Sequence, residues 1–162
     1  MADIHPVLKK LQEKFPGSLF EAKTFREETT VTVPKKEIVE ICKLLYADPD
    51  LQYQFLTDLC GLDFFPERPR FEVVYLLTSL RTNQRLRLKV KVGEGESVLS
   101  VESVWKAANW LEREVYDLFG IPFEKHPDLR RILLWDGFEG HPLRKDFPVE
   151  GPDFDKPFVP EV

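Results

Sequence analysis

Hydrophobic residues recur along the chain with two different periods, and each period predicts one kind of element. Apolar residues three or four apart predict amphipathic helices over 4–15, 35–46 and 104–119. Shorter runs rich in apolar and β-branched residues predict strands over 19–25, 29–33, 53–65, 70–81 and 84–92. The order helix, hairpin, helix, three strands, helix predicts an α+β fold: a two-layer domain with helices packed on a mixed, mostly antiparallel sheet.

The last predicted strand has the clearest alternation. Its leucines and valines alternate with four cations, Arg85, Arg87, Lys89 and Lys91. One face of this strand therefore belongs to the core, and the other face carries a row of positive charge. We interpret the row as a solvated sheet face, and a docking patch for an acidic partner is the alternative.

The helix over 104–119 has a well-defined apolar face. Wound at about 100° per residue, its apolar side chains gather on one side, which we expect to face the core. Gly120 is predicted to cap this helix in the left-handed conformation, and Pro122 prevents its continuation. The residues of the predicted core face are Val104, Ala107, Ala108, Leu111, Val115, Leu118 and Phe119.

Three residues of the same helix are predicted on its opposite, outward face. These are Trp110, Arg113 and Asp117. A tryptophan in this position either tucks under the C-terminal segment of its own chain or anchors another subunit, since Trp and Arg are enriched at interface hot spots. For Arg113 we expect a carboxylate partner, within the chain or on a neighbour.

Glu112, Glu114 and His126 are the candidates for a catalytic group. The two glutamates fall at the margins of the apolar arc, and residues two apart on a helix point in different directions. They therefore cannot flank one substrate bond as paired carboxylates do. His126 precedes a proline, which favours extended or turn backbone. We predict no catalytic centre in this chain, and a stand-alone small enzyme that uses these three residues is a distant alternative.

Composition narrows the class of protein. The chain has 162 residues, of which 43% are hydrophobic and 31% charged, as expected for one soluble globular domain. A net charge of −5 argues against a nucleic-acid partner. The longest apolar run, around 73–77, is far shorter than the ~20 residues that cross a bilayer. We expect any membrane association to come through another protein.

The cysteine count bears on cofactors and on the compartment. Iron–sulfur clusters and structural zinc usually need four Cys or His ligands, and this chain has two cysteines, Cys42 and Cys60. Cys42 has helical spacing with neighbouring apolar residues, so we predict a buried structural thiol there and a packing role for Cys60. The first residues lack the pattern of a secretory signal, which predicts a cytosolic chain. We expect no cofactor in this chain.

Two sequence blocks resemble a known family. The first contains Glu112-Arg113-Glu114 and Asp117-Leu118-Phe119, followed by His126, Arg130 and Ile132-Leu133. The second runs from Gly137 to Pro148. Together they resemble the signature of the 30 kDa subunit family of respiratory complex I, whose members are also called the C subunit of NADH-quinone oxidoreductase. The predicted order of elements also fits that family's two-layer α+β domain.

The resemblance implies a structural subunit without a redox centre, in the peripheral arm of a proton-translocating NADH-quinone oxidoreductase. FMN, iron–sulfur clusters and quinone are then expected in partner subunits. The implied partners are the 49-kilodalton-type subunit, which we call the D subunit, and neighbouring iron–sulfur subunits. The implied location is the cytoplasmic face of the cell membrane, or the matrix side in mitochondria. The equivalent subunit of a related membrane-bound hydrogenase, or of a quinone reductase with another electron donor, is the nearer alternative.

We predict a domain over 1–145 and a proline-rich extended tail over 146–162. Four prolines exclude a long helix in the tail, and its phenylalanines have little local core. The tail is either a disordered end or an arm ordered by a partner, and we predict the arm. The charged turn at 144–146 would make a second contact with a neighbour. The predicted partner interface comprises Trp110, Arg113, Asp117, Arg144, Lys145, Asp146, Phe147, Phe154 and Phe158.

Overall fold

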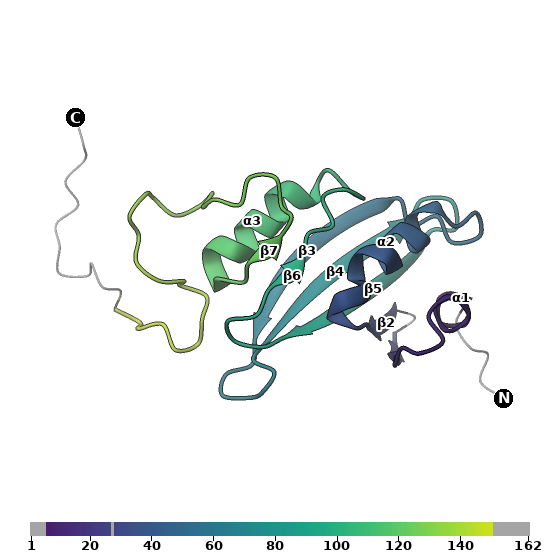
Figure 1. Cartoon of the computed structure of the whole chain (residues 1–162), viewed down its shortest axis with the longest axis horizontal. Coiled ribbons are helices and arrows are strands. Elements are labelled where there is room, and N and C mark those ends of the chain that lie inside the picture. The colour runs from purple at the N-terminus through teal and green to yellow at the C-terminus, as the bar shows by residue number, and fades with distance from the viewer. Residues whose placement is uncertain (1–5, 27, 151–162) are drawn as a thin grey trace.

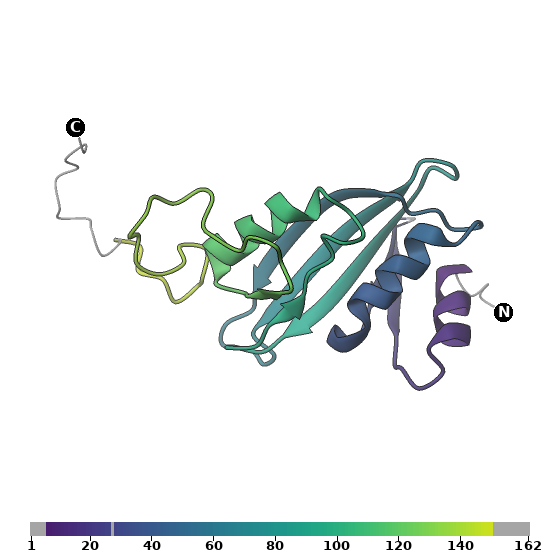
Figure 2. The ribbon, with the colours of Figure 1, turned by 45° about the horizontal axis from the view of Figure 1, so that its top comes forward.

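The computed structural model describes residues 6–26 and 28–150, and it has the predicted α+β architecture (Figure 1). Helices lie against one face of a five-stranded sheet, which Figure 2 shows from a second direction. The helices are α1 (Pro6–Lys14), the short 3-10 helix η1 (Lys35–Glu37), α2 (Ile38–Ala47) and α3 (Ala108–Phe119). The strands are β1 (Glu21–Phe25), β2 (Glu28–Thr32), β3 (Phe55–Asp63), β4 (Phe71–Ser79), β5 (Gln84–Val92), β6 (Val98–Leu99) and β7 (Phe123–Glu124).

The main sheet is mixed and mostly antiparallel, which confirms the sequence-based expectation. Its strand order is β1-β2-β5-β4-β3, and the pairing of β2 with β5 is parallel while the other three pairings are antiparallel. A separate parallel pair joins β6 to β7. The pattern of apolar residues did not predict this pair, because strands of two residues are too short to show a period.

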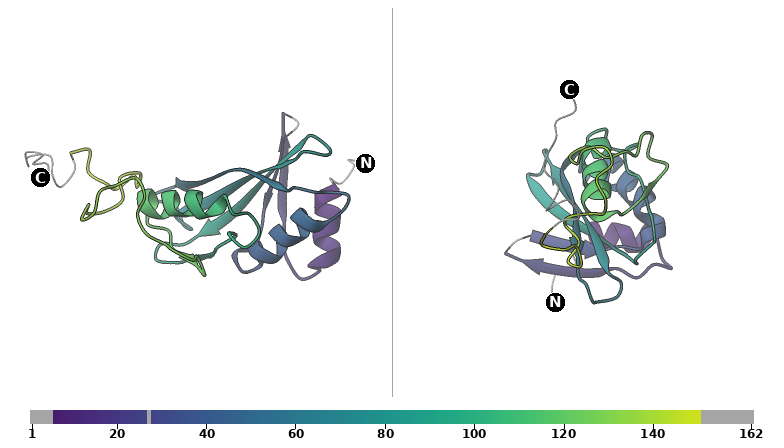
Figure 3. Two further views of the ribbon diagram at one scale, coloured as in Figure 1. Left: turned by 90° about the horizontal axis from the view of Figure 1, so that it is seen from above. Right: turned by 90° about the vertical axis from the view of Figure 1, so that its left-hand side faces the viewer.

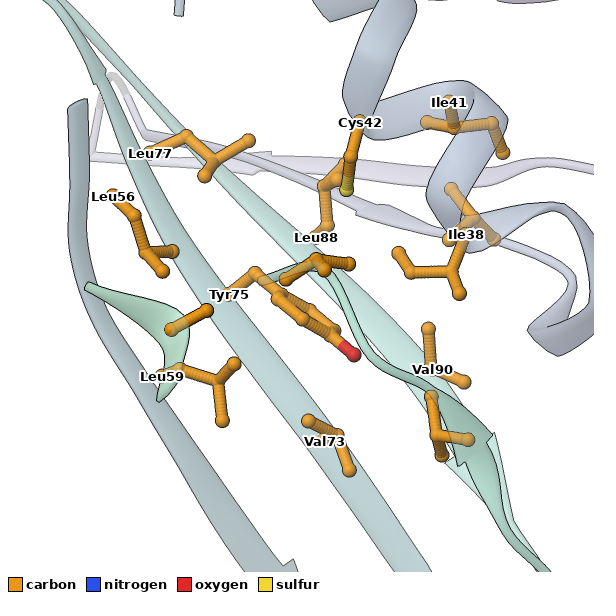
Figure 4. Close-up of a cluster of buried hydrophobic side chains, with 14 of the residues drawn as sticks. Ile38, Ile41, Cys42, Leu56, Leu59, Val73, Tyr75, Leu77, Leu88 and Val90 are labelled. Carbon is orange, nitrogen blue, oxygen red and sulfur yellow. The ribbon is translucent and has the colours of Figure 1, made fainter. Parts of the chain in front are cut away.

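The core lies between α2 and the middle of the sheet (Figure 4). Alternate residues of β4 and β5 point to this side, among them Tyr75 and Leu88, which are fully buried. Ile38 and Ile41 of α2 pack above them. Cys42 is also fully buried, as predicted for a structural thiol. Burial raises the pKa of this thiol, which keeps it protonated.

The opposite face of β5 carries the predicted row of cations. Glutamates of β1, β2 and β4 lie within 4.0 Å of these cations, so much of the positive charge is neutralised within the sheet. This pairing favours the solvated face over a patch for an acidic partner, since little unpaired charge is left to attract one. Arg85 and Arg87 lie 4.0 and 2.8 Å from Glu28, Lys89 lies 2.8 Å from Glu72, and Lys91 lies 3.7 Å from Glu21.

Helix α3 begins four residues later than predicted. Residues 101–107 form turns in which the Val101 carbonyl accepts hydrogen bonds from the N–H groups of Val104 and Trp105. The apolar residues of these turns happen to have the same spacing as those of the helix. The spacing alone therefore places the start of the helix too early. Within 6–26 and 28–150, no helix has the length and apolar character needed to cross a membrane.

Candidate partner interface

Residues 126–147, which we call the signature segment, contain the C-terminal part of the first sequence block and all but the last residue of the second, and they form no helix or strand. The segment lies around the C-terminal part of α3, at the end of the molecule far from α1 (Figures 1 and 3). A segment of this length without regular structure needs other contacts to satisfy its backbone polar groups. Charged side chains of α3 supply many of them.

Asp117 holds the middle of the signature segment. Its side chain is fully buried, and Oδ2 accepts hydrogen bonds from three successive backbone N–H groups, those of Ile132, Leu133 and Leu134, at 3.0, 2.8 and 3.0 Å. Oδ1 accepts a bond of 2.8 Å from Arg131. Burial alone would raise the pKa of this carboxyl, but the four donors outweigh it and hold the pKa below its ordinary value. Asp117 is therefore a buried carboxylate.

Arg113 holds the same segment one helical turn earlier. Its Nε and Nη2 donate hydrogen bonds of 3.1 Å each to the backbone carbonyls of Arg130 and Arg131. The guanidinium carbon lies 5.3 Å from the centre of the Trp110 ring, in a cation–π arrangement. The Arg113 side chain is almost completely buried, while Trp110 remains 61% exposed.

The predicted outward orientation of Arg113 and Asp117 is therefore wrong. Both side chains are buried, and Arg113 pairs with two carbonyls instead of the expected carboxylate. The physical reason is that α3 is covered on two sides. The sheet covers its apolar face, and the signature segment covers part of its polar face through hydrogen bonds, which hydrophobic periodicity does not register. Trp110 is not tucked under the described part of the C-terminal segment.

The second block closes the C-terminal end of α3. The last carbonyls of a helix have no partner within the helix, and here three of them accept hydrogen bonds from the second block. His141 Nδ1 donates to the carbonyl of Asp117 at 2.8 Å, and the N–H of Leu143 donates to the carbonyl of Leu118 at 3.1 Å. Arg144 Nε donates to the carbonyl of Phe119 at 2.6 Å. Arg144 thus bonds within its own chain at a helix terminus that favours cations.

Gly120 is the residue that lets the second block approach so closely. It has the predicted left-handed conformation, with φ of 72°. A Cβ atom at this position would lie 2.5 Å from the His141 ring and 2.7 Å from Arg144. We expect Gly120→Ala to lower the free energy of unfolding by about 2–4 kcal/mol, because it adds strain at positive φ to overpacking. Denaturant unfolding of the isolated chain measures this, and Gly17→Ala, where a Cβ would meet nothing within 4 Å, is the control.

Arg70 fixes the far end of the signature segment. This buried arginine, at the start of β4, forms a bidentate pair with Asp63 at 2.9 and 3.0 Å and binds Asp146 at 2.5 and 3.0 Å. Asp63 also accepts a bond of 2.9 Å from the N–H of Lys145. Burial would raise the pKa of Asp63, but Arg70 and the backbone N–H groups of Phe65 and Lys145 lower it to about 2. Asp146 thus bonds within its own chain, yet both Asp146 and Lys145 stay exposed, and their contact with a neighbour stays a prediction.

Large apolar side chains project from the segment that these charges hold. Leu133, Trp135 and Leu143 are 61%, 59% and 52% exposed. Trp135 contacts Phe138 edge-on at 4.8 Å between ring centres, and Phe138 stacks on Phe147 at 6.0 Å. The predicted interface residue Phe147 is therefore partly covered by its own segment. Sequence reasoning missed the three exposed residues, although large apolar residues between prolines and glycines were a usable signal.

The remaining candidates from the sequence fall in different places. Glu112 and the His126 side chain are buried together, with 3.9 Å between Oε2 and Nε2, whereas Glu114 is exposed. The structure thus does not bring the three proposed catalytic residues into one site. Phe154 and Phe158 lie outside the described residues. Among the described residues, no group of three or more His, Cys, Asp or Glu side chains is placed to hold a metal ion.

Known proteins share both the sequence and the fold. Residues 31–153 match the family of the respiratory-chain NADH dehydrogenase, 30 kDa subunit. The C subunit of NADH-quinone oxidoreductase from Geotalea uraniireducens (strain Rf4) is 51% identical over 154 residues, which cover 94% of this chain and 93% of that protein. The C subunit from Geobacter sulfurreducens is 49% identical over 155 residues, which cover 94% of each chain.

Two solved structures are similar to the fold. The trypsin-resistant fragment of Nqo5 has a TM-score of 0.61 and 35% identity, and the match covers 76% of this chain and 99% of the fragment. A chain of the membrane-bound sulfane sulfur reductase, an archaeal respiratory membrane complex, has a TM-score of 0.73 at 24% identity, over 88% and 84% of the two chains. The second likeness concerns the fold alone. The buried signature residues, the fold and the matched relatives agree: this chain belongs to the family of the 30 kDa subunit of respiratory-chain NADH dehydrogenase.

Proposed function

We propose that this chain is a structural subunit, without a redox centre of its own, in the peripheral arm of a proton-translocating NADH-quinone oxidoreductase. It binds the D subunit and keeps it in place for electron transfer from NADH, through FMN and iron–sulfur centres of other subunits, to quinone. The chain reaches the membrane through this complex, on the cytoplasmic or matrix side. The names of its relatives, which are C subunits of NADH-quinone oxidoreductases, support the complex.

One observation carries the assignment of the interface. The signature segment is fixed by buried charges, yet it exposes Leu133, Trp135 and Leu143 to solvent. Apolar side chains held in a fixed arrangement bind a partner with little loss of conformational entropy. Buried aromatic and arginine residues commonly provide most of the binding energy at protein interfaces. The segment therefore has the properties of a preorganised docking surface for a large protein partner.

Trp135→Ala tests this surface. We expect the Kd of the purified chain for the D subunit to rise by about 30-fold or more, as for a central interface tryptophan. The free energy of unfolding should fall by about 1 kcal/mol or less, because Trp135 is half-exposed and loses mainly its contact with Phe138.

Leu80→Ala is the matched control for that experiment. Leu80 is 75% exposed in the turn between β4 and β5, away from the signature segment. Its truncation should leave the Kd unchanged. A Trp135→Ala chain that binds the partner as tightly as the unchanged protein would refute the proposed interface.

The electron donor is tested separately. The fold likeness to a sulfane sulfur reductase chain is a reason to examine a related complex with another donor, such as a membrane-bound hydrogenase. Affinity purification of the native protein, with optical detection of flavin and iron–sulfur centres, identifies the neighbouring subunits. An FMN-containing module that oxidises NADH supports our proposal. A nickel-binding large subunit in its place would favour the hydrogenase.

A further inference from the structure

The carboxyl group of Glu112 lies where three segments of the chain meet. These are α3, the turn after β6 and the turn after β7. The side chain is fully buried, and the two groups that donate hydrogen bonds to it are neutral. The hydroxyl of Ser100 donates to Oε2 at 2.6 Å, and the N–H of Val101 donates to Oε1 at 2.8 Å. Neither donor is a cation, so these hydrogen bonds would not neutralise a negative charge on Glu112.

His126 is the basic residue next to this carboxyl. Its Nδ1 accepts a hydrogen bond of 3.0 Å from the N–H of Asp128, so Nδ1 carries no proton. Its Nε2 lies 3.0 Å from the carbonyl oxygen of Asn109, which can only accept, so Nε2 carries the proton. The ring is therefore neutral in this arrangement. The 3.9 Å from Nε2 to Glu112 Oε2 is too long for a hydrogen bond.

The surroundings of Glu112 disfavour its ionised form. Tyr75 of β4 and Cys42 of α2 interact electrostatically with it from the core side, and neither carries a positive charge. Glu102, in the turn before α3, adds a negative charge nearby. Burial raises the pKa of Glu112 to about 7, although the bonds from Ser100 and Val101 act in the opposite direction. The carboxyl thus changes its charge near neutral pH.

We propose that Glu112 and His126 form a pH-responsive latch that seats the start of the signature segment on α3. When Glu112 is protonated, its Oε2–H donates to the Ser100 hydroxyl oxygen 2.6 Å away, and the Nε2–H of His126 stays bonded to Asn109. When Glu112 loses its proton to solvent, the Nε2–H turns from the Asn109 carbonyl to the new carboxylate. The Nε2–Oε2 distance is now 3.9 Å and would fall to about 2.9 Å in a hydrogen bond, so the ring moves by about 1 Å. The turn at 126–128 moves with the ring, because Nδ1 remains bonded to the N–H of Asp128.

The position of the turn connects this latch to the interface. Residues 126–128 lead directly to Arg130 and Arg131, whose carbonyls are held by Arg113. A shift of the turn therefore acts on the segment that exposes Leu133 and Trp135. This consequence for partner binding rests on the proposed function, whereas the change of hydrogen-bond partner at His126 does not. An experiment can therefore refute the latch without refuting the partner interface, and the reverse is also possible.

Nuclear magnetic resonance of the full isolated chain tests the latch without any variant. As pH rises from 5 to 9, the side-chain carboxyl carbon of Glu112 should titrate with a midpoint near 7, instead of near the ordinary value of 4.5. The Nε2–H signal of His126 and the amide signal of Asp128 should change with the same midpoint.

Glu112→Gln separates the latch from changes at His126 that do not depend on the Glu112 carboxyl. The variant keeps a side chain that can bond to Ser100 and Val101, and it should abolish the changes at His126 and Asp128 near pH 7. Glu114→Gln, on the exposed side of the same helix, should retain them. The proposal is overturned if Glu112 titrates near 4.5, or if its titration leaves the Nε2–H signal unmoved. It is equally overturned if the Nε2–H signal of His126 and the amide signal of Asp128 still change near pH 7 in Glu112→Gln.

The change of Tm with pH is a second test of the latch, and the raised pKa fixes the direction of this change. A pKa raised in the folded state means that the folded chain binds the proton more tightly than the unfolded chain. The contribution of Glu112 is therefore fully present below about pH 4.5 and is lost as pH rises to about 7. The difference in Tm between the unchanged chain and Glu112→Gln should move in favour of the variant over this window. A constant difference would contradict the raised pKa.

Discussion

Asp117→Ala should lower the free energy of unfolding of the isolated chain by about 3–5 kcal/mol, the range found when one partner of a buried ionic contact is removed. The variant leaves three backbone N–H groups, of residues 132–134, without their acceptor, and it also removes the carboxylate partner of Arg131. Typical domains have a total stability of about 5–15 kcal/mol. We therefore expect a large change in the denaturant midpoint, and limited proteolysis should cut first within the signature segment.

Asp136→Ala is the matched control for this prediction. It removes the same type of side chain from an exposed position in the same segment. Exposed substitutions of this kind usually change stability by no more than about 0.5 kcal/mol. If Asp117→Ala were as stable and as resistant to protease as Asp136→Ala, then Asp117 would not hold the segment.

Arg70→Ala should have an effect of similar size at the other end of the segment. It leaves the buried carboxylate of Asp63 without its bidentate partner, which costs about 3–5 kcal/mol. It also releases Asp146, which binds the same guanidinium. Arg68→Ala, two residues away on the exposed surface, is the control and should be nearly neutral. Denaturant unfolding at neutral pH measures both variants.

The same variant changes the response to acid. The pKa of Asp63 is lowered from 3.8 to about 2, so its contribution to stability is present above about pH 3.8 and is lost as pH falls through about 2. Removing Arg70 should raise this pKa toward its ordinary value, so the loss of stability between pH 4 and pH 2 should become smaller. An acid-unfolding curve of Arg70→Ala with the same slope between pH 2 and 4 as the unchanged chain would contradict this role of the Arg70–Asp63 pair.

The fold could be predicted from local patterns because the sheet has one apolar face. The alternation over 84–92 matches β5 residue for residue, and the break at Gly120 matches the end of α3. The parallel β6–β7 pair was missed because strands of two residues show no period, and the late start of α3 was missed because the turns over 101–107 keep a helical spacing of apolar residues. Hydrophobic spacing records which residues face a core, and it does not record which turns precede a helix.

Two of the predicted interface residues were assigned the wrong environment, while the interface itself stays a prediction. Arg113 and Asp117 were assigned to the surface because charge on the polar side of a helix usually means solvent. Here the polar side meets backbone groups of a long loop, and buried charges are stable when those groups donate or accept their hydrogen bonds. The exposed residues that follow from this arrangement, Leu133 and Trp135, lie on the loop and not on the helix.

In our proposal, the charged residues of α3 act on the partner indirectly. They fix the backbone of the signature segment from inside the chain, and the segment in turn presents apolar side chains outward. This explains why the two sequence blocks contain so many ionisable residues without an arrangement that suggests a reaction centre. We expect substitutions at Asp117 to weaken partner binding by loosening the segment, and substitutions at Trp135 to weaken it by removing a contact.

Site-specific photo-crosslinking in native membranes is the decisive experiment for the proposed interface. A photoreactive amino acid at position 135 should form a covalent product with the D subunit, identified by mass spectrometry. The same amino acid at position 80 should give no such product. We expect a crosslink to the D subunit from position 135 alone. No product from position 135, or the same product from both positions, would show that the signature segment is not the partner interface.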